Sequence, residues 1–296
     1  MLSEIQNVGV IGCGLMGSGI AQVCAQAGYG TVVREVDEGL LEHGVASIHK
    51  NLDRALAKGK LTEPDRDAIA DRLTATIDLG DLSECDLIIE AIVENREAKH
   101  ELFSTLDGLC RATAIFASNT SSLSITELAA GTGRGDRFVG LHFFNPVPVM
   151  PLVEVVRCGQ TSEESFKLAL AFASSLGKSP VACRDNTGFI VNRLLVPYML
   201  DAIRAYEQGV GSIADIDTGM RLGCGYPMGP FTLGDFVGLD TLYHITEIMY
   251  DEYKDARFAA PSLLRRMFLA GYHGRKTGMG FYDYSDDEPV VSDFVK

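Results

Sequence analysis

A histidine and a glutamate twelve residues apart form the clearest candidate acid–base pair in the sequence. His142 lies at the end of the apolar run Phe138–Phe143, and Glu154 lies in the next run, Leu152–Val156, with a proline-bearing turn between them. An antiparallel return of the chain would bring the two side chains together. A carboxylate on one imidazole nitrogen fixes the tautomer and favours the imidazolium, which leaves the other nitrogen to take a proton from a hydroxyl group. We therefore predict that His142 and Glu154 act as one catalytic pair.

A glycine-rich loop near the N-terminus is the candidate for holding a dinucleotide. Gly12, Gly14 and Gly17 follow the apolar run Asn7–Ile11 and precede a helix of small residues. The first glycine allows a tight turn, the second lets the backbone approach a pyrophosphate, and the third lets helix and strand pack closely. Glu35, at the end of the next predicted strand, would accept hydrogen bonds from ribose hydroxyls. An ordinary glycine turn is the competing interpretation.

Two neighbours of Glu35 leave the nucleotide preference open. Asp37 is a rival ligand for the ribose, and Arg34 could accommodate a 2′-phosphate. A carboxylate receives ribose hydroxyls well but repels a phosphate. We therefore predict NAD rather than NADP as the cofactor.

Basic residues recur every four positions in one predicted helix. Lys50, Arg54 and Lys58 share a helix face. On a chain with 26 basic and 40 acidic residues and a net charge of −14, this local stripe could meet the phosphates of an anionic ligand. A solvated basic face is an equally good interpretation.

The elements that must position these residues alternate in the first half of the chain. Short apolar runs alternate with segments of helical spacing, which favours a doubly wound α/β sheet of the Rossmann type. The predicted strands are Asn7–Ile11, Thr31–Arg34, Asp86–Ala91, Ala114–Ser118, Phe138–Phe143, Leu152–Val156 and Pro180–Cys183. The predicted helices run to about Ala27, from Asp37 to about Lys58, from Thr62, over Arg96–Leu109, and from Thr161 to about Leu176.

The second half of the chain reads as helical. Helices are predicted from Gly188 to about Gln208, and over Ile213–Leu222, Leu233–Tyr253 and Ser262–Ala270, with a short strand at Gly280–Tyr284. We therefore predict a dinucleotide-binding domain over residues 1–184 and an all-α domain over residues 185–296.

Composition excludes several classes of protein. The acidic balance argues against nucleic acid and anionic membranes as partners, and no apolar run approaches the roughly 18 residues that span a bilayer. The seven cysteines are odd in number and scattered, so neither a disulfide framework nor a metal site is expected. Because the strand-like run Asn7–Ile11 begins almost at the start of the sequence, we expect no targeting segment. These features predict a soluble, acidic, globular protein of the cytoplasm.

Longer motifs give the sequence a family resemblance. They are Ser118–Ser122, Leu141–Pro146, Gly188–Arg193, Tyr226–Pro230 and Lys276–Tyr282. With the glycine loop and Glu154, they make the chain resemble the L-3-hydroxyacyl-CoA dehydrogenases nearly end to end, and the bacterial 3-hydroxybutyryl-CoA type in particular. The resemblance implies an NAD-dependent interconversion of (S)-3-hydroxyacyl-CoA and 3-oxoacyl-CoA, and a C-terminal domain that forms a homodimer.

The resemblance also implies roles for individual residues. Ser121 and Asn192 match polar residues that hydrogen-bond the reacting oxygen, beside the catalytic His142 and Glu154. The implied NAD contacts are Gly12, Gly14, Leu15, Met16, Gly17, Glu35, Glu94, Lys99, Ser121, Asn145 and Lys276. The implied acyl-CoA contacts are Ser121, Asn51 and Lys58; relatives often have serine where this chain has Asn51. A dehydrogenase of free hydroxy acids and a non-catalytic dinucleotide-binding protein are the alternatives.

Overall fold

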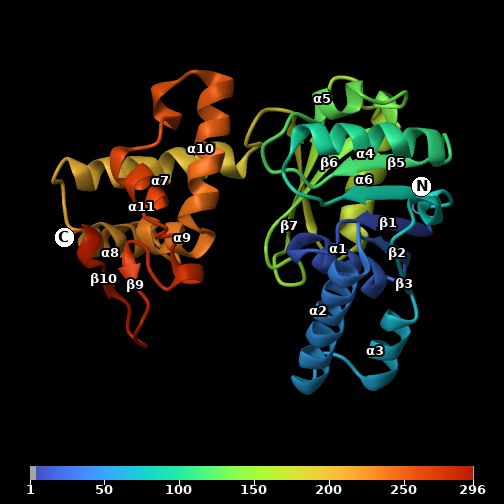
Figure 1. Cartoon of the computed structure of the whole chain (residues 1–296), viewed down its shortest axis with the longest axis horizontal. Coiled ribbons are helices and arrows are strands. Elements are labelled where there is room, and N and C mark those ends of the chain that lie inside the picture. Colours follow the sequence, from blue (N-terminus) through green and yellow to red (C-terminus); the bar gives the residue numbers. More distant parts are fainter. Residues whose placement is uncertain (1–4, 296) are drawn as a thin grey trace. The chain divides into compact units, whose positions relative to one another are not determined.

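An eight-stranded sheet forms the centre of the first half of the chain (Figure 1). The computed structural model describes residues 5–295, and its strands are ordered β3-β2-β1-β4-β5-β6-β7-β8. All neighbours pair in parallel except β6 and β7, which are antiparallel. The strands are β1 (Asn7–Ile11), β2 (Gly30–Arg34), β3 (Leu73–Thr76), β4 (Leu87–Glu90), β5 (Ile115–Ser118), β6 (Phe138–Phe143), β7 (Leu152–Arg157) and β8 (Ser179–Arg184).

Helices cover both faces of this sheet, because each face carries an apolar set of side chains. One core cluster joins the sheet to α1 (Leu15–Gln26), α2 (Glu38–Ala57) and α6 (Glu163–Ser175). The other cluster joins it to α4 (Arg96–Leu109) and α5 (Ile125–Ala130), which lie together above the sheet in Figure 1. The remaining helix of this half, α3 (Glu63–Ala70), begins after Thr62 as expected, and the structure shows a capping box between Thr62 and Asp65. The doubly wound α/β architecture is confirmed.

The second half of the chain is built from helices around its own core. They are α7 (Val191–Glu207), α8 (Ile213–Cys224), α9 (Pro230–Val237), α10 (Leu239–Tyr253) and α11 (Ser262–Leu269), followed by the two-residue strands β9 (Tyr282–Asp283) and β10 (Val290–Val291). The chain divides into two compact units after Phe189. The boundary predicted from sequence lies five residues earlier, at 184/185, and stays a prediction. No helix among residues 5–295 is long and apolar enough to cross a lipid bilayer.

Three sequence-based element predictions need correction. Strand β3 was not expected, because Leu73–Thr76 is a short edge segment with only partial burial. The single helix predicted over Leu233–Tyr253 is two helices, because Gly238 takes a φ of +101°, outside the helical region. The helix predicted from Gly188 begins at Val191, since Gly188 and Phe189 both have positive φ.

Candidate active site

The glycine loop joins β1 to α1 as the sequence predicts. Gly12 has a φ of +92°, and a Cβ there would lie 2.6 Å from the carbonyl oxygen of Ala91. A Cβ at Gly17 would lie 1.7 Å from the carbonyl oxygen of Gly12, so only glycine lets α1 approach the loop this closely. A Cβ at Gly14 would meet no protein atom within 4 Å. The backbone at Gly14 therefore faces open space, where the pyrophosphate of a dinucleotide could come close to it.

A cavity of about 780 Å³ lies beside this loop. Its lining includes five residues that the sequence analysis assigned to the cofactor: Gly12, Gly14, Leu15, Met16 and Glu35. Its other walls are mostly apolar and come from the ends of β2 and β4 and from α2 and α4; they include Val36, Leu40, Leu79, Ile92 and Leu102. Glycines at a helix N-terminus, a carboxylate and an apolar wall suit the phosphates, ribose and base of a dinucleotide.

Glu35 and Asp37 have different partners. Glu35 Oε2 accepts a hydrogen bond from the Cys13 N–H at 2.7 Å, and Oε1 accepts one from the Val36 N–H at 2.7 Å. Asp37 instead caps α2, since its Oδ1 accepts from the Leu40 N–H at 2.9 Å. Arg34 also lines the cavity, with its Nε donating to the Ile77 carbonyl at 3.2 Å. The geometry therefore favours Glu35 over Asp37 as the ribose ligand.

His142 and Glu154 are direct neighbours across β6 and β7. His142 Nδ1 and Glu154 Oε2 are 2.6 Å apart, and both side chains are buried. The antiparallel return expected from the sequence is the cause of this contact, because opposed residues on antiparallel strands point to the same face. Among residues 5–295, His142 Nε2 makes no hydrogen bond, whereas Nδ1 is held by Glu154. A buried imidazole held by a carboxylate is suited to moving a proton.

The loop after β5 carries several hydroxyl groups around one carboxylate. Glu94 Oε1 accepts hydrogen bonds from the Thr120 hydroxyl at 2.5 Å, the Ser121 N–H at 3.0 Å and the Ser122 hydroxyl at 3.1 Å. The hydroxyl of Ser121 itself has no partner among the described residues. Burial raises the pKa of Glu94, but Lys99 and these hydrogen bonds outweigh it and hold the pKa below its usual range. Glu94 therefore stays ionised and shapes the loop that presents Ser121.

Lys99 supports this carboxylate from inside the protein. Its ammonium is buried and lies 2.5 Å from Glu90 Oε1 and 3.2 Å from Glu94 Oε2. Glu90 is also buried, and its Oε2 accepts a hydrogen bond from the Ser118 hydroxyl at 2.6 Å. The buried charges thus compensate one another, as buried charges must. Lys99 reaches the loop through Glu94, and its assignment as a cofactor neighbour stays a prediction.

The other assigned residues lie farther along the chain. Asn145 is exposed and follows β6, at a cis peptide bond to Pro146. Asn192 is in the first turn of α7 and is partly exposed, in the second unit. Lys276, also in the second unit, pairs with Asp240 at 2.5 Å. The roles of these three residues stay predictions.

The basic stripe lies along α2. Lys50 and Arg54 are exposed on this helix, Lys58 is exposed at its C-cap, and Asn51 is partly buried beside them. No acidic side chain among the described residues forms a salt bridge with Lys50, Arg54 or Lys58. The stripe is therefore available to an anionic group.

Sequence reasoning missed several residues of this region. Glu90 holds Lys99 and itself accepts a hydrogen bond from the Ser118 hydroxyl. The Asn119 side chain accepts a hydrogen bond from the Phe143 N–H at 2.9 Å, which ties the hydroxyl loop to β6. A carboxylate inside the apolar run of β4 was a signal for Glu90, since buried acids are almost always paired.

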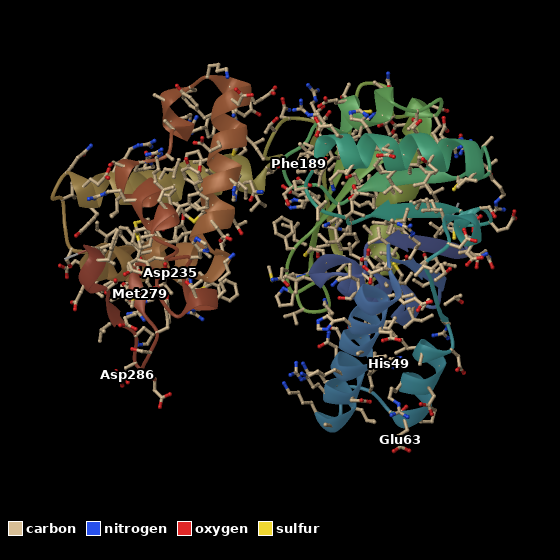
Figure 2. The ribbon with its side chains drawn as sticks, viewed as in Figure 1. His49, Glu63, Phe189, Asp235, Met279 and Asp286 are labelled. Carbon is tan, nitrogen blue, oxygen red and sulfur yellow. The ribbon has the colours of Figure 1, made fainter. Side chains whose placement is uncertain are left out.

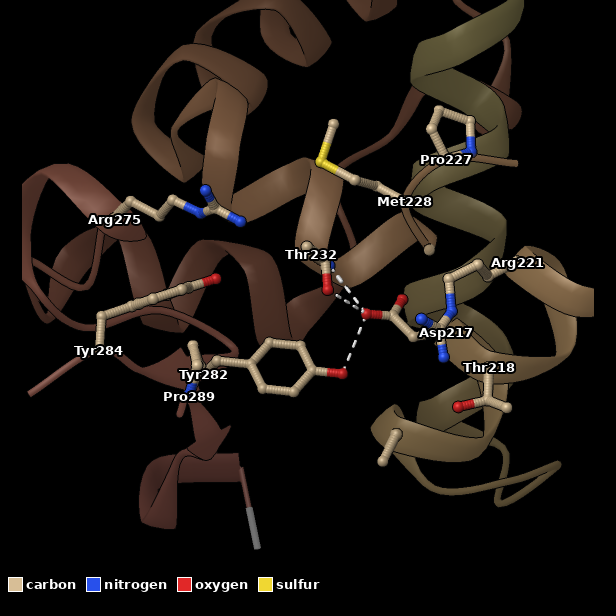
Figure 3. A pocket seen from close by; sticks show the side chains of 12 residues that line it. Asp217, Thr218, Arg221, Pro227, Met228, Thr232, Arg275, Tyr282, Tyr284 and Pro289 are labelled. Carbon is tan, nitrogen blue, oxygen red and sulfur yellow. Dashed lines mark hydrogen bonds between the residues drawn. The ribbon is translucent and has the colours of Figure 1, made fainter. Parts of the chain in front are cut away.

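The second unit also has a cavity, of about 410 Å³. Here the Asp217 carboxylate accepts hydrogen bonds from Thr232 and from the Tyr282 hydroxyl (Figure 3).

A doubly wound sheet with a glycine loop, a carboxylate directly after its second strand and a buried histidine–glutamate pair at its carboxyl edge is the architecture of a dinucleotide-dependent oxidoreductase. Comparison with known proteins makes this more specific. Residues 7–186 match the NAD-binding domain of 3-hydroxyacyl-CoA dehydrogenase, and residues 188–284 match the C-terminal domain of the same enzyme family.

Individual relatives agree with these matches. A 3-hydroxybutyryl-CoA dehydrogenase of Mycobacterium tuberculosis is 49% identical over 286 residues, which cover 96% of this chain and 100% of that protein. The human mitochondrial hydroxyacyl-coenzyme A dehydrogenase is 47% identical over 95% of this chain and 91% of its own length. The crystal structure of (S)-3-hydroxybutyryl-CoA dehydrogenase from Ralstonia eutropha has a TM-score of 0.92 at 44% identity, covering 95% of this chain and 100% of that one. The chain belongs to the 3-hydroxyacyl-CoA dehydrogenase family.

Proposed function

We propose that this chain interconverts (S)-3-hydroxyacyl-CoA and 3-oxoacyl-CoA, with 3-hydroxybutyryl-CoA as its main substrate and NAD as its cofactor. The observation that carries the proposal is the 2.6 Å contact between His142 Nδ1 and Glu154 Oε2 in the sheet that also carries the glycine loop. The names of the relatives from M. tuberculosis and R. eutropha support the choice of a four-carbon acyl group.

The residues of the pair have separate tasks in this proposal. His142 Nε2 accepts the proton of the substrate's C3 hydroxyl in the oxidative direction and returns it in the reverse direction. The buried Glu154 carboxylate fixes the imidazole tautomer and stabilises the imidazolium that forms. Bound NAD supplies the hydride acceptor for this reaction.

Ser121 and Asn192 orient the reacting oxygen. Their hydrogen bonds stabilise the charge that develops on the C3 oxygen when its proton is transferred. Glu94 assists by holding the backbone of Ser121 in place. Asn145 and Lys276 are proposed as further neighbours of the cofactor, on the family resemblance.

The basic stripe on α2 is proposed to recognise the coenzyme A part of the substrate. Lys50, Arg54 and Lys58 offer positive charge to the phosphates, and Asn51 offers a hydrogen bond beside them. A dehydrogenase of free hydroxy acids would have no use for this stripe, which favours the CoA ester.

The proposed setting is a homodimer in the cytoplasm. The family resemblance supports the dimer. Two-fold homodimers are also the commonest oligomers. The seven cysteines support a reducing compartment, because all are free and six of them are buried.

A panel of substrates tests the proposal. The purified enzyme is given 3-oxoacyl-CoA esters of increasing chain length and the corresponding free 3-oxo acids, with NADH and NADPH in parallel, and absorbance of the reduced nicotinamide is followed. We expect turnover with the CoA esters, highest for the four-carbon ester with NADH. Turnover of the free acids at equal efficiency would replace the CoA assignment, and no turnover of any substrate would favour a binding protein without catalysis.

A further inference from the structure

A phenylalanine at the end of the first unit has an unusual backbone conformation. Phe189, labelled in Figure 2, directly follows Gly188. Its φ is +48°, and that of Gly188 is +82°. Among the non-glycine residues described, Phe189 and Lys254 have positive φ. A bulky L-residue is strained in this region because its Cβ approaches the following carbonyl group. Such strain persists only where the surrounding structure imposes it, and it is most frequent at functional sites.

Hydrogen bonds at both ends of the segment 185–189 impose this conformation. The Asp185 carboxylate accepts from the Ser124 hydroxyl and from the backbone N–H groups of Ile125 and Thr126, at 2.7 to 3.0 Å. These donors lie at the N-terminus of α5. At the other end, the Phe189 N–H donates to the Asn186 carbonyl at 2.7 Å. The segment is therefore fastened to α5 and closes in a tight turn that fixes where the Phe189 side chain lies.

The ring of Phe189 packs against the imidazole of His142. Their centroids are 5.5 Å apart with the planes inclined by 56°, and the ring of Phe144 lies 4.5 Å from the imidazole. Phe189 and His142 are 5% and 4% exposed. Two aromatic rings thus enclose an imidazole whose Nδ1 is already held by Glu154.

We propose that Phe189 is a positioning residue for His142, and this inference rests on the proposed function. The hydrogen bond to Glu154 fixes one nitrogen but leaves the imidazole free to swing about it. The ring of Phe189 removes that freedom and keeps water away from the imidazole–carboxylate contact, which strengthens the interaction. The strained backbone is the consequence of directing a large ring onto the histidine from the chain segment that ends the first unit.

Four variants test this role. Phe189→Leu removes the ring and Phe189→Tyr keeps it. Phe189→Gly removes the ring and also relieves the backbone strain. Phe172→Leu is the matched control, because Phe172 is a buried phenylalanine of the same unit in the core cluster on the opposite face of the sheet. Each variant is measured for kcat and KM, and for hydrogen–deuterium exchange at the imidazole C2 of His142 by mass spectrometry.

We expect Phe189→Leu and Phe189→Gly to lower kcat roughly 10- to 100-fold, the usual effect of a misplaced catalytic group, with KM for NADH unchanged. Both should accelerate exchange at His142. Phe189→Tyr should keep kcat within about threefold of the parent, and Phe172→Leu should change neither kcat nor the exchange rate. In a His142→Ala background, Phe189→Leu should lower the residual turnover no further, because the two residues act together.

Other outcomes separate the two proposals. Normal kcat and normal exchange in Phe189→Leu, together with a large loss in His142→Ala, would overturn the role of Phe189 alone. Equal losses in Phe189→Leu and Phe172→Leu would show a general effect of core packing and would also overturn it. Full turnover in His142→Ala would instead refute the proposed function on which the inference rests.

Discussion

The buried contact between His142 and Glu154 predicts strong and coupled effects of mutation. His142→Ala should lower kcat by about two to four orders of magnitude, the usual contribution of a positioned proton-transfer group. Glu154→Gln keeps the shape of the side chain but removes its charge, so kcat should also fall substantially. Steady-state kinetics of both single variants and the double variant measure these losses.

The double variant is the decisive part of that experiment. The losses should be far from multiplicative, because each residue acts through the other. Binding of NADH, measured by fluorescence titration, should be nearly unchanged in all three proteins, since the glycine loop and Glu35 are untouched. Near-normal turnover in either single variant, or losses that simply multiply, would mean that the hydroxyl proton leaves through another group.

Glu35 makes the cofactor preference testable. Its carboxylate is held by the N–H groups of Cys13 and Val36 and would repel a 2′-phosphate. We expect the parent enzyme to favour NADH over NADPH, and Glu35→Gln to reduce that preference by about tenfold or more, equivalent to about 1.4 kcal/mol. Arg34→Ala is the control, because removing the nearest cation should lower use of NADPH further. Equal catalytic efficiency of the parent enzyme with NADH and NADPH would show that Arg34, and not Glu35, determines the cofactor preference.

The sequence predicted these individual residues where a local pattern carries the chemistry. A glycine loop between a strand and a helix, and a histidine and a glutamate on successive strands, could be recognised without knowing the fold. For Glu90 the sequence carries a signal of burial but does not identify its partner Lys99. Phe189 could not be recognised, because its importance comes from His142, which only folding brings near.

At the level of elements, the roles of Gly14 and Gly17 at the junction of β1 and α1 can be distinguished by experiment. Gly17→Ala should lower the free energy of unfolding by about 3 kcal/mol, because its Cβ would overlap the Gly12 carbonyl and the backbone must shift. Gly14→Ala should leave stability nearly unchanged, because a Cβ there meets no protein atom. It should still weaken NADH binding by occupying the space for the pyrophosphate. Urea unfolding and NADH titration distinguish the two effects, and equal stability losses would contradict this assignment.

Asp235 on α9 predicts a pH dependence of stability. This buried carboxylate, labelled in Figure 2, accepts hydrogen bonds from the N–H groups of Phe281 and Tyr282 and from the Tyr284 hydroxyl. It thereby fastens the C-terminal segment. Burial raises the pKa of Asp235 from 3.8 to about 6; the neighbouring Asp217 adds to the rise and the three donors oppose it. The folded state favours the protonated form of Asp235. The contribution of this carboxyl group to the free energy of unfolding is therefore complete below pH 3.8 and is lost as the pH rises through about 6.

The corresponding variant is Asp235→Asn, which stays neutral at every pH. Its free energy of unfolding relative to the parent should increase by up to about 3 kcal/mol between pH 4 and pH 7. Asp286→Asn, at an exposed position, should show no such change. Urea unfolding across this pH range checks the result, and parallel curves for the parent and Asp235→Asn would contradict it.

The elements that the sequence predicted well have strong local signals, and the errors have physical causes. Buried strands such as β4 and β5 each begin with three apolar residues in succession, a pattern that parallel sheets favour. Strand β3 lacks such a run because it lies at the edge of the sheet. The break at Gly238 was missed because apolar spacing continues through it, and only the positive φ ends the helix.

At the scale of the whole molecule, an exposed apolar surface on the second unit predicts that two copies of the chain associate. Ile190, Leu194, Tyr198 and Tyr226 line an apolar cavity of about 410 Å³, and Leu194 and Leu222 are 66% and 74% exposed. A grouped apolar surface of this kind marks an interaction site more often than free surface. The C-terminal domain is the part that the family resemblance assigns to dimer formation, and a symmetric contact would let one patch cover its copy.

Light scattering after size-exclusion chromatography tests this directly. We expect a dimer at micromolar concentration for the parent protein. Leu194→Glu should shift the equilibrium to the monomer, because it places a charge in the centre of the apolar patch, where an unpaired charge is costly to bury. Val149→Glu, at a comparably exposed position in the first unit, should leave the dimer intact. A parent protein that is monomeric throughout this range would contradict the prediction, and a dimer that resists Leu194→Glu would place the contact on another surface.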